Sequence, residues 1–134
     1  MAGENDNIPL REKVTAAIGG CAEAMTEIGD RLELCVQQLR VHPSEDTFNA
    51  VTMLIDNLQS LNALVIGISQ SCAYTGIPAD AFSSWQQTGE IFSSMEEAFS
   101  RSDWLSFADL LQYELHPKMM ELRDSLVALL KQLN

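Results

Sequence analysis

The sequence has few of the residues on which catalysis and metal binding most often depend. Its only histidines and cysteines are His42, His116, Cys21, Cys35 and Cys72. It contains no CxxC or HExxH pattern, and neither histidine follows a glutamate by three positions, as a di-iron helical bundle requires. The pair Gly19-Gly20 lacks the third glycine and the Lys-Ser/Thr of a phosphate-binding loop. We therefore expect that the protein is not an enzyme, and that it has no metal, no cofactor and no catalytic residue.

Positive charge is absent from a long central stretch. No lysine or arginine lies between Arg40 and Arg101. The acidic residues of this stretch are Glu45, Asp46, Asp56, Asp80, Glu90, Glu96 and Glu97. Because the whole chain carries a net charge of −11, it repels nucleic-acid phosphates and anionic lipid. We expect neither nucleic acid nor membrane as a partner.

The sequence also lacks signals for membranes and for secretion. Its longest run without charge, residues 57–79, contains several Asn, Gln and Ser residues and is too polar to predict a membrane span. Residues 1–8 show no secretory leader, and the three cysteines occupy apolar helical positions that suit reduced, buried thiols. These features predict a cytoplasmic protein with a disordered acidic segment, residues 1–8, and a single domain, residues 9–134.

What the sequence does contain is helical periodicity. Apolar residues recur every three or four positions in four segments, residues 9–41, 44–73, 79–100 and 104–133. Pro43 ends the first segment, and Ser44 is a suitable N-cap for the second. Pro117 lies inside the last segment and predicts a kink. The connections are short, so we expect an all-α fold, an up-down-up-down four-helix bundle.

Small residues predict where the first two helices touch. A tight connection at residues 42–43 makes these helices an antiparallel hairpin. In such a hairpin, the residue numbers of any two facing positions add up to the same value. By this rule the small residues of the two helices face one another: Ala16 with Ser71, Gly20 with Gly67, and Ala24 with Ala63. Such residues allow two backbones to approach closely. We expect this helix-contact notch to make a large side chain at Gly20 destabilising.

The third helix is shorter than the others, which predicts apolar surface left for a partner. A partner helix would dock on this surface by one apolar face. Our candidate partner-binding residues are Phe82, Trp85 and Phe92, with Tyr74 and Ile77 in the preceding loop. The alternative interpretation is that these residues simply pack in the core.

Two other classes of function stay open. The apolar seam of the first helix has a 3.5-residue period that would suit pairing with a second copy in a coiled-coil-like homodimer. A small-ligand sensor or an enzyme would instead need an enclosed pocket, for which the kink around Tyr113, Glu114 and Pro117 is the candidate place. His116 beside this kink is expected to be solvated, with a phosphotransfer histidine as the alternative.

A motif surrounds this kink. Residues 102–117 resemble a pattern, D-x-x-x-x-A-D-L-L-E-Y-E-L-x-P, of an uncharacterised family of bacterial helical proteins. Asp103, Ala108-Asp109-Leu110-Leu111, Tyr113-Glu114-Leu115 and Pro117 match, and Gln112 replaces an acid. The resemblance implies a bacterial protein from motility or surface-glycosylation gene neighbourhoods.

In size, helix count and acidity the chain is also similar to flagellar export chaperones. That resemblance implies an adaptor or export-chaperone-like protein that cradles an amphipathic segment of a client.

Overall fold

The structure is a computed structural model that describes the backbone of residues 2–41 and 43–134 and the side chains of residues 9–41 and 43–134. Its elements are α1 (Ala2–Val41), α2 (Glu45–Thr75), the 3₁₀ helix η1 (Asp80–Gln87), α3 (Thr88–Ser100), α4 (Trp104–Asp109), the π-helical segment η2 (Leu110–Leu115) and α5 (His116–Leu133). The described residues form helices and no strands, which confirms the all-α class. The predicted disorder of residues 1–8 and the predicted turn at residue 42 fall on positions outside the fully described residues.

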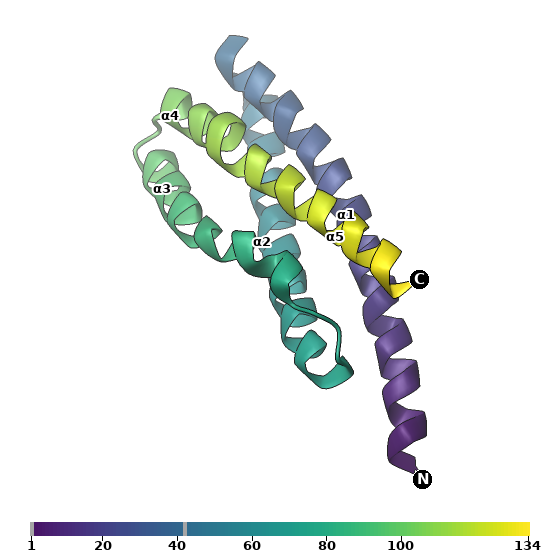
Figure 1. Cartoon of the computed structure of the whole chain (residues 1–134). Coiled ribbons are helices and arrows are strands. Elements are labelled where there is room, and N and C mark those ends of the chain that lie inside the picture. Colours follow the sequence, from purple (N-terminus) through teal and green to yellow (C-terminus); the bar gives the residue numbers. More distant parts are fainter. Residues whose placement is uncertain (1, 42) are drawn as a thin grey trace.

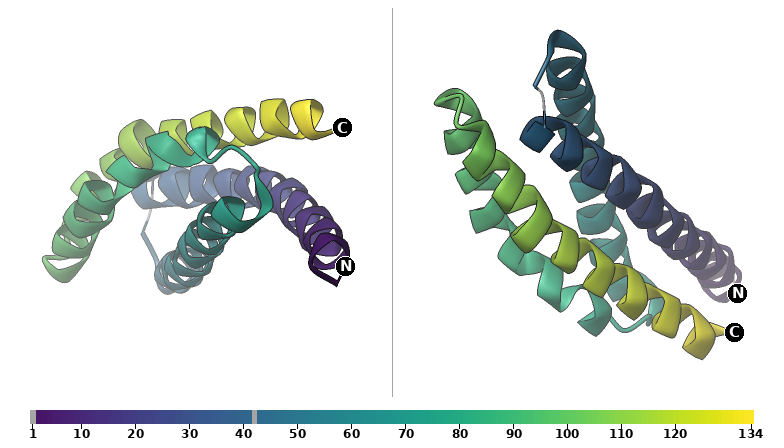
Figure 2. Two further views of the ribbon diagram at one scale, coloured as in Figure 1. Left: turned by 60° about the horizontal axis from the view of Figure 1, so that its bottom comes forward. Right: turned by 90° about the horizontal axis from the view of Figure 1, so that it is seen from above.

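Two helical hairpins make up the molecule (Figures 1 and 2). In the first, α2 runs back along α1; in the second, η1 and α3 run beside α4, η2 and α5. The hairpins meet where α5 packs on α1. Consequently α1 lies between α2 and α5, whereas the backbone of α2 packs closely against α1 alone. One side of the assembly, between α2 and α3, stays open.

Local signals define the ends of α2. Ser44 and Thr47 form a reciprocal capping box: the Thr47 N–H donates to Ser44 Oγ at 3.3 Å, and the Ser44 N–H donates to Thr47 Oγ1 at 3.2 Å. These bonds satisfy amide groups that have no partner within the helix. At the other end Gly76 adopts φ 72°, a left-handed conformation that costs glycine little. The predicted start of α2 is confirmed, and the helix ends two residues later than predicted.

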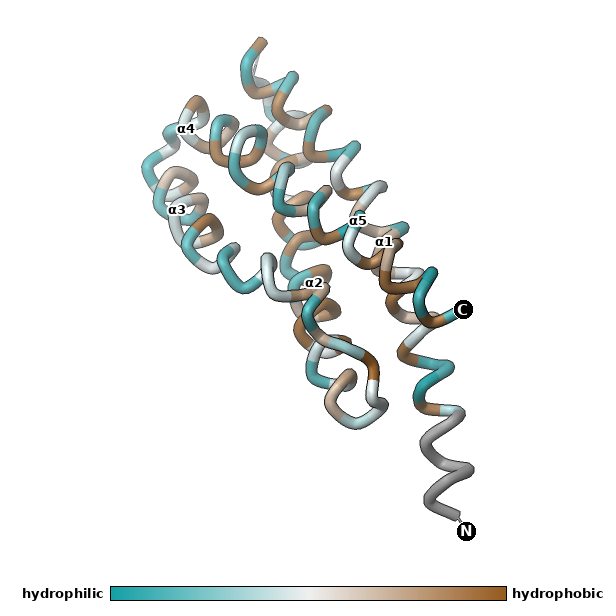
Figure 3. The backbone as a smooth tube through the Cα atoms, viewed as in Figure 1, coloured by the Kyte–Doolittle hydropathy of each residue, from teal (hydrophilic) through white to brown (hydrophobic). Residues whose placement is uncertain are grey.

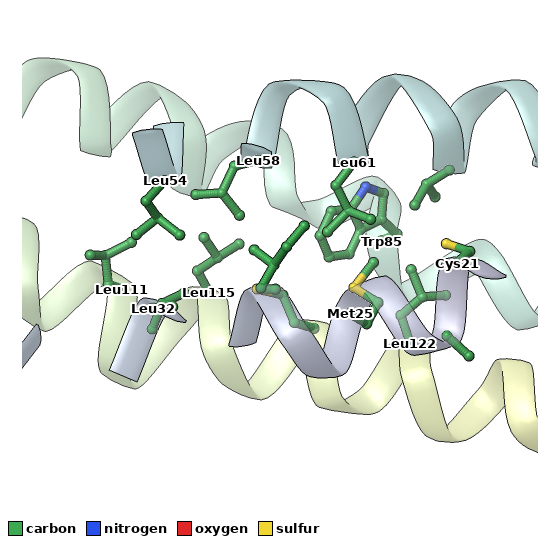
Figure 4. Close-up of a cluster of buried hydrophobic side chains, with 14 of the residues drawn as sticks. Cys21, Met25, Leu32, Leu54, Leu58, Leu61, Trp85, Leu111, Leu115 and Leu122 are labelled. Atoms are coloured by element: carbon green, nitrogen blue, oxygen red, sulfur yellow. The ribbon is translucent and has the colours of Figure 1, made fainter. Parts of the chain in front are cut away.

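The core follows the predicted apolar seams (Figure 4). Leu54, Leu58 and Leu61 from α2 meet Met25 and Leu32 from α1, all almost fully buried. Leu111, Leu115 and Leu122 enter the same cluster from η2 and α5, and Trp85 enters it from η1. Burial of this apolar surface, at roughly 25 cal/mol per Å², is the main force that holds the two hairpins together.

The predicted small-residue notch is wrong. Gly20 and Gly67 are exposed, and a Cβ atom built on either would meet nothing within 4 Å. Ala16 and Ala63 are also exposed, while Ala24 and Ser71 are half-buried. The seam residues Ile18, Cys21 and Met25 already occupy the inward face of α1. Successive helical residues point about 100° apart, so Gly20 is turned away from that face.

The close approach lies instead between α1 and α5, at Gly29. A Cβ atom there would lie 2.9 Å from Met120 Cε and 3.5 Å from His116 Nε2. Gly29 is buried. The glycine that allows two helices to approach is therefore nine positions beyond the predicted one, and it faces a different helix.

Because Gly20 has open space around it, Gly20→Ala should stabilise the protein. Alanine is favoured over glycine in a helix interior by about 0.5–1 kcal/mol. We expect the free energy of unfolding, measured by urea titration, to rise by that amount. Gly76→Ala is the matched control and should destabilise by about 1 kcal/mol, because alanine resists a positive φ. A loss of stability for Gly20→Ala would mean that Gly20 is packed.

The third predicted helix is divided into two types of helix. Its first half is the 3₁₀ helix η1, in which residues three apart lie on one face. Phe82, Trp85 and Thr88 are spaced in this way and are all buried. The Thr88 hydroxyl donates to the Trp85 carbonyl at 2.6 Å, at the transition to α3. The three-residue spacing of these buried side chains is compatible with the tighter helix, which places all three on one face.

Pro117 changes the type of helix. Proline lacks an N–H and clashes with the carbonyl four residues earlier in an α-helix. The preceding turns widen into the π-helical segment η2, where the His116 N–H donates to the Leu111 carbonyl five residues back. The predicted disturbance at Pro117 is therefore present as a π-helix.

Candidate functional site

The open side of the molecule holds an apolar groove, which we call the α2–α3 groove. It consists of two adjoining hollows of about 370 and 380 Å³, and Asn62 and Phe92 line both. The first hollow is lined by Ile55, Leu58, Gln59, Asn62, Phe92, Met95, Glu96, Phe99 and Phe107. The second is lined by Asn62, Val65, Ile66, Ser69, Gln70, Phe82, Trp85, Gln86, Thr88, Gly89 and Phe92. Together they follow α2 from Ile55 to Gln70, about 23 Å at 1.5 Å per residue.

Every phenylalanine and tryptophan of the chain lies in this groove or at its end. Phe82, Trp85, Phe92, Phe99 and Phe107 line it. Trp104 extends the row, since its ring centroid lies 5.4 Å from that of Phe99 and 4.8 Å from that of Phe48. Aromatic side chains bury large apolar areas and are enriched at the centres of protein interfaces. This concentration makes the groove our candidate functional site.

One polar contact joins the two walls of the groove. Trp85 Nε1–H on η1 donates to Asn62 Oδ1 on α2 at 2.9 Å. Indole nitrogen can only donate, so this bond also fixes which end of the Asn62 amide faces Trp85. Trp85 is buried and Asn62 is half-buried. The bond sets the spacing of α2 and η1 at the middle of the groove.

Removal of this bond should cost stability. In Asn62→Ala the indole N–H of the buried Trp85 loses its acceptor, and an unsatisfied buried donor costs about 1–3 kcal/mol. We expect the free energy of unfolding to fall by that amount in urea titrations. Asn49→Ala, an exposed asparagine on the same helix, is the control and should change stability by no more than about 0.5 kcal/mol. Equal effects of the two variants would contradict a role for the bond.

The walls of the groove carry acidic and neutral polar residues and no base. Glu96 is among the lining residues, and Gln59, Gln70 and Gln86 supply neutral polar groups. The elements that form the two walls, α2, η1 and α3, lie within the stretch that has no lysine or arginine. Among the described residues that line the groove, Glu96 is the only charged one, so the groove is an apolar surface with a negative rim at Glu96.

Much of the apolar surface of α2 is left uncovered. By length and composition alone this helix could cross a membrane, although the sequence predicted a polar run there, and only 33% of its most apolar window is buried. Figure 3 shows apolar residues recurring along α2. Ile66 lines the groove and is 46% exposed. A core helix of a soluble protein is usually covered on more sides, so α2 has surface available for another molecule.

The structure brings together three of the five candidate partner-binding residues. Phe82, Trp85 and Phe92 all line the groove; the first two are buried and Phe92 is half-buried. Tyr74 and Ile77 do not line it, since Tyr74 is 77% exposed and Ile77 is packed in the core. The opposite wall, built by Ile55, Asn62 and Ile66 of α2, was not expected from sequence. The sequence feature that could have revealed this wall is the number of apolar residues in α2, which is too large for a single buried face.

The motif around the kink forms a separate contact with the end of α1. Arg40 donates from Nη2 to Asp109 Oδ1 at 2.6 Å and to Gln112 Oε1 at 2.8 Å, and its guanidinium carbon lies 5.8 Å from the Tyr113 ring centroid. Tyr113 and Glu114 are exposed, and Pro117 follows the π-helical turns. These contacts hold α1 against η2, which gives the motif a structural role.

His116 lies where α1 and α5 approach each other. Its Nε2 atom is 3.2 Å from Glu33 Oε1, and the ring packs beside Gly29. His116 also lines a hollow of about 280 Å³, together with Glu33 and Gln112 among others. The histidine is half-buried, so the expectation that it is solvated is only partly right. In the described part of the chain, no three His, Cys, Asp or Glu side chains are grouped to hold a metal ion.

The three cysteines are free and buried. Burial raises the pKa of the Cys21 thiol to about 11 and raises the pKa values of Cys35 and Cys72 as well. The neutral thiol is thus favoured in the folded state. The neighbouring seam of α1, from Val14 to Leu39, is covered by the other helices and presents no apolar face to a second copy. A homodimer through that seam does not fit this structure.

The raised thiol pKa predicts a loss of stability at high pH. A thiol whose pKa is higher in the folded state than in the unfolded state stabilises the folded protein. This stabilisation is complete at pH values below the unfolded-state pKa and is lost as the pH rises toward the folded-state pKa. For Cys21 that window runs from about pH 9 to about 11. We expect the free energy of unfolding of the wild-type protein to fall more steeply across this window than that of Cys21→Ala. Parallel pH profiles would show that the Cys21 thiol ionises equally well in both states.

A comparison with family models adds one finding. Residues 17–125 match the model described as "Domain of unknown function (DUF8042)". The chain belongs to the DUF8042 family. The DUF8042 match includes both walls of the α2–α3 groove and the contact between Arg40 and η2. No curated protein and no solved structure matches the chain.

Proposed function

We propose that this protein is a non-enzymatic, cytoplasmic, protein-binding adaptor or export-chaperone-like protein. In this proposal the chain is an up-down-up-down four-helix bundle that is open along one side, and a helical segment of a partner protein docks in the α2–α3 groove. A bacterial origin and a place in motility or surface-glycosylation gene neighbourhoods are part of the same proposal, which the motif at residues 102–117 suggests.

The observation that carries the proposal is the row of aromatic side chains along an open groove. All five phenylalanines and both tryptophans gather there, while the tyrosines Tyr74 and Tyr113 lie elsewhere and are exposed. Phe82, Trp85 and Phe107 are buried, whereas Phe92 and Trp104 are half-buried and Phe48 and Phe99 are exposed. Exposed aromatic surface costs solubility, so a monomer gains nothing from these four side chains unless another molecule covers them. The apolar lining of the groove and the absence of a strand edge among the described residues favour docking of a helix over addition of a strand.

A panel of synthetic amphipathic helical peptides tests this proposal. Each peptide has about 16 residues, a helix of about 24 Å that matches the length of the groove, with leucine on one face and lysine, glutamate or glutamine on the other. Binding is measured by fluorescence anisotropy of a label on the peptide. At least one member is expected to bind, and Phe92→Glu, which places a charge on the groove wall, is expected to raise its Kd at least about tenfold.

The matched control is Leu34→Glu, an equal change at an exposed residue of α1 that does not line the groove. Its Kd should stay within about twofold of the wild-type value. Urea unfolding of both variants establishes that they are folded. Absence of binding by every peptide, or equal effects of the two variants, would contradict the proposal.

A further inference from the structure

We infer that the partner helix is basic: its apolar face fills the α2–α3 groove, and lysine or arginine residues on its flanks meet the groove's negative rim. This inference rests on the proposed function and adds the chemistry of the partner. Its basis is the charge of the two walls. Glu96 lines the groove and is exposed, and neither wall contributes a base.

Two bases on elements next to these walls are already engaged. Arg101, at the end of α3, has its Nη2 atom 2.7 Å from Glu97 Oε1. Lys118, on α5, donates to Gln87 Oε1 at 2.8 Å and lies 3.6 Å from Glu121 Oε2. Arg101 and Lys118 therefore neutralise Glu97 and Glu121, and the electrostatic potential of the groove stays negative. A helix with a basic flank therefore gains attraction at the part of the groove lined by Glu96, which raises its association rate and orients it.

A second copy of this chain does not have the required chemistry. Each copy carries a net charge of −11, so two copies repel one another. Two helices carry several bases: α1 has Arg11, Lys13, Arg31 and Arg40, and α5 has Lys118, Arg123 and Lys131. The apolar faces of both helices are buried in the core of their own molecule, so neither can place such a face in a second groove. An anionic membrane is disfavoured by the same charge.

The experiment compares three peptides of one design that share the leucine face and differ only in the flanking residues: lysine, glutamine or glutamate. At about 0.05 M salt the lysine peptide should bind at least about tenfold more tightly than the glutamate peptide, with the glutamine peptide between them. The ratio should approach one near 0.5 M salt, because salt screens exposed charges. Helicity of the free peptides is matched by circular dichroism, so that propensity does not account for the difference.

Charge variants of the protein locate the effect. Glu96→Lys should weaken binding of the lysine peptide at least about fivefold at low salt, whereas Glu23→Lys, the same change at an exposed position of α1, should have less than about a twofold effect. Equal affinity for the three peptides, or equal effects of the two variants, would overturn the basic-partner inference. If binding still depends on Phe92, the groove itself would remain the docking site. If no peptide binds, the proposed function fails as well.

Discussion

Trp85→Ala is expected to remove about 3–5 kcal/mol from the free energy of unfolding. The indole is almost fully buried, and it lies in the same cluster as Leu61 and Met25 (Figure 4). Truncation of a buried tryptophan forfeits its transfer free energy and leaves a cavity between α2 and η1. Its bond to Asn62 is lost too, although the half-buried amide can then bind water. Urea unfolding followed by far-ultraviolet circular dichroism measures the effect without depending on tryptophan fluorescence.

Trp104→Ala is the comparison for this prediction. Trp104 is half-buried and packs against Phe48 and Phe99 at the exposed end of the groove, so its loss should cost clearly less. Trp85→Phe keeps most of the apolar volume and should cost less than about 1.5 kcal/mol. If Trp85→Ala cost no more than Trp104→Ala, Trp85 would not be the core residue that joins the two hairpins.

Gly29→Leu is expected to be the most damaging glycine substitution in α1, with a loss of about 2–3 kcal/mol. Even a Cβ atom at Gly29 would lie 2.9 Å from Met120 Cε. The flexible end of Met120 can move away from alanine, but the remaining atoms of leucine would also meet the His116 ring. Such overpacking forces helices apart or side chains out of their preferred rotamers.

Gly20→Leu in the same helix is the matched control. Its side chain would extend into open space, and leucine is a better helix former than glycine, so stability should stay the same or rise slightly. Both variants are compared by urea titration with the slopes checked for equality. A larger loss at Gly20 than at Gly29 would show that α1 is rotated relative to this structure.

These two glycines illustrate what could and could not be predicted from the sequence. The apolar seam of α1 has a regular 3.5-residue period, and its buried face was correctly predicted from Val14 to Leu39. A face that is already filled by large apolar residues cannot also hold the small residues at Gly20. The notch was predicted by pairing residue numbers along the two helices. That pairing ignored the side of the helix on which each residue lies, which changes by about 100° from one residue to the next. Contact at Gly29 depends on where α5 crosses α1, which no local pattern determines.

Irregular helices were recognised only in part. Pro117 indicated a disturbed helix, but whether the backbone bends or widens into π-helical turns depends on the surrounding packing. Phe82, Trp85 and Thr88 are spaced by three in the sequence, but this spacing also suits an α-helix and therefore did not reveal the 3₁₀ helix. The longer α-helical pattern that follows these residues concealed it.

The candidate site was half predicted. Phe82, Trp85 and Phe92 were named from their spacing and from the short third helix, and they form one wall of the groove. The other wall belongs to α2, which was interpreted as a helix with a single buried seam. Its side chains at Ile55 and Ile66 become a groove wall only because α3 stays at a distance from α2. That distance is set by the two hairpins together, so a sequence pattern within one helix does not reveal it.

The central claim is that the α2–α3 groove binds a basic amphipathic helix, and methyl-resolved nuclear magnetic resonance tests it most directly. The isoleucine and methionine methyl groups are labelled and the lysine-flanked peptide is titrated in. We predict that the signals of Ile55, Ile66 and Met95, which line the groove, shift in a saturable way, while that of the exposed Met53 on α2 does not. Saturable shifts at Met53 with unchanged signals from the groove would contradict the claim.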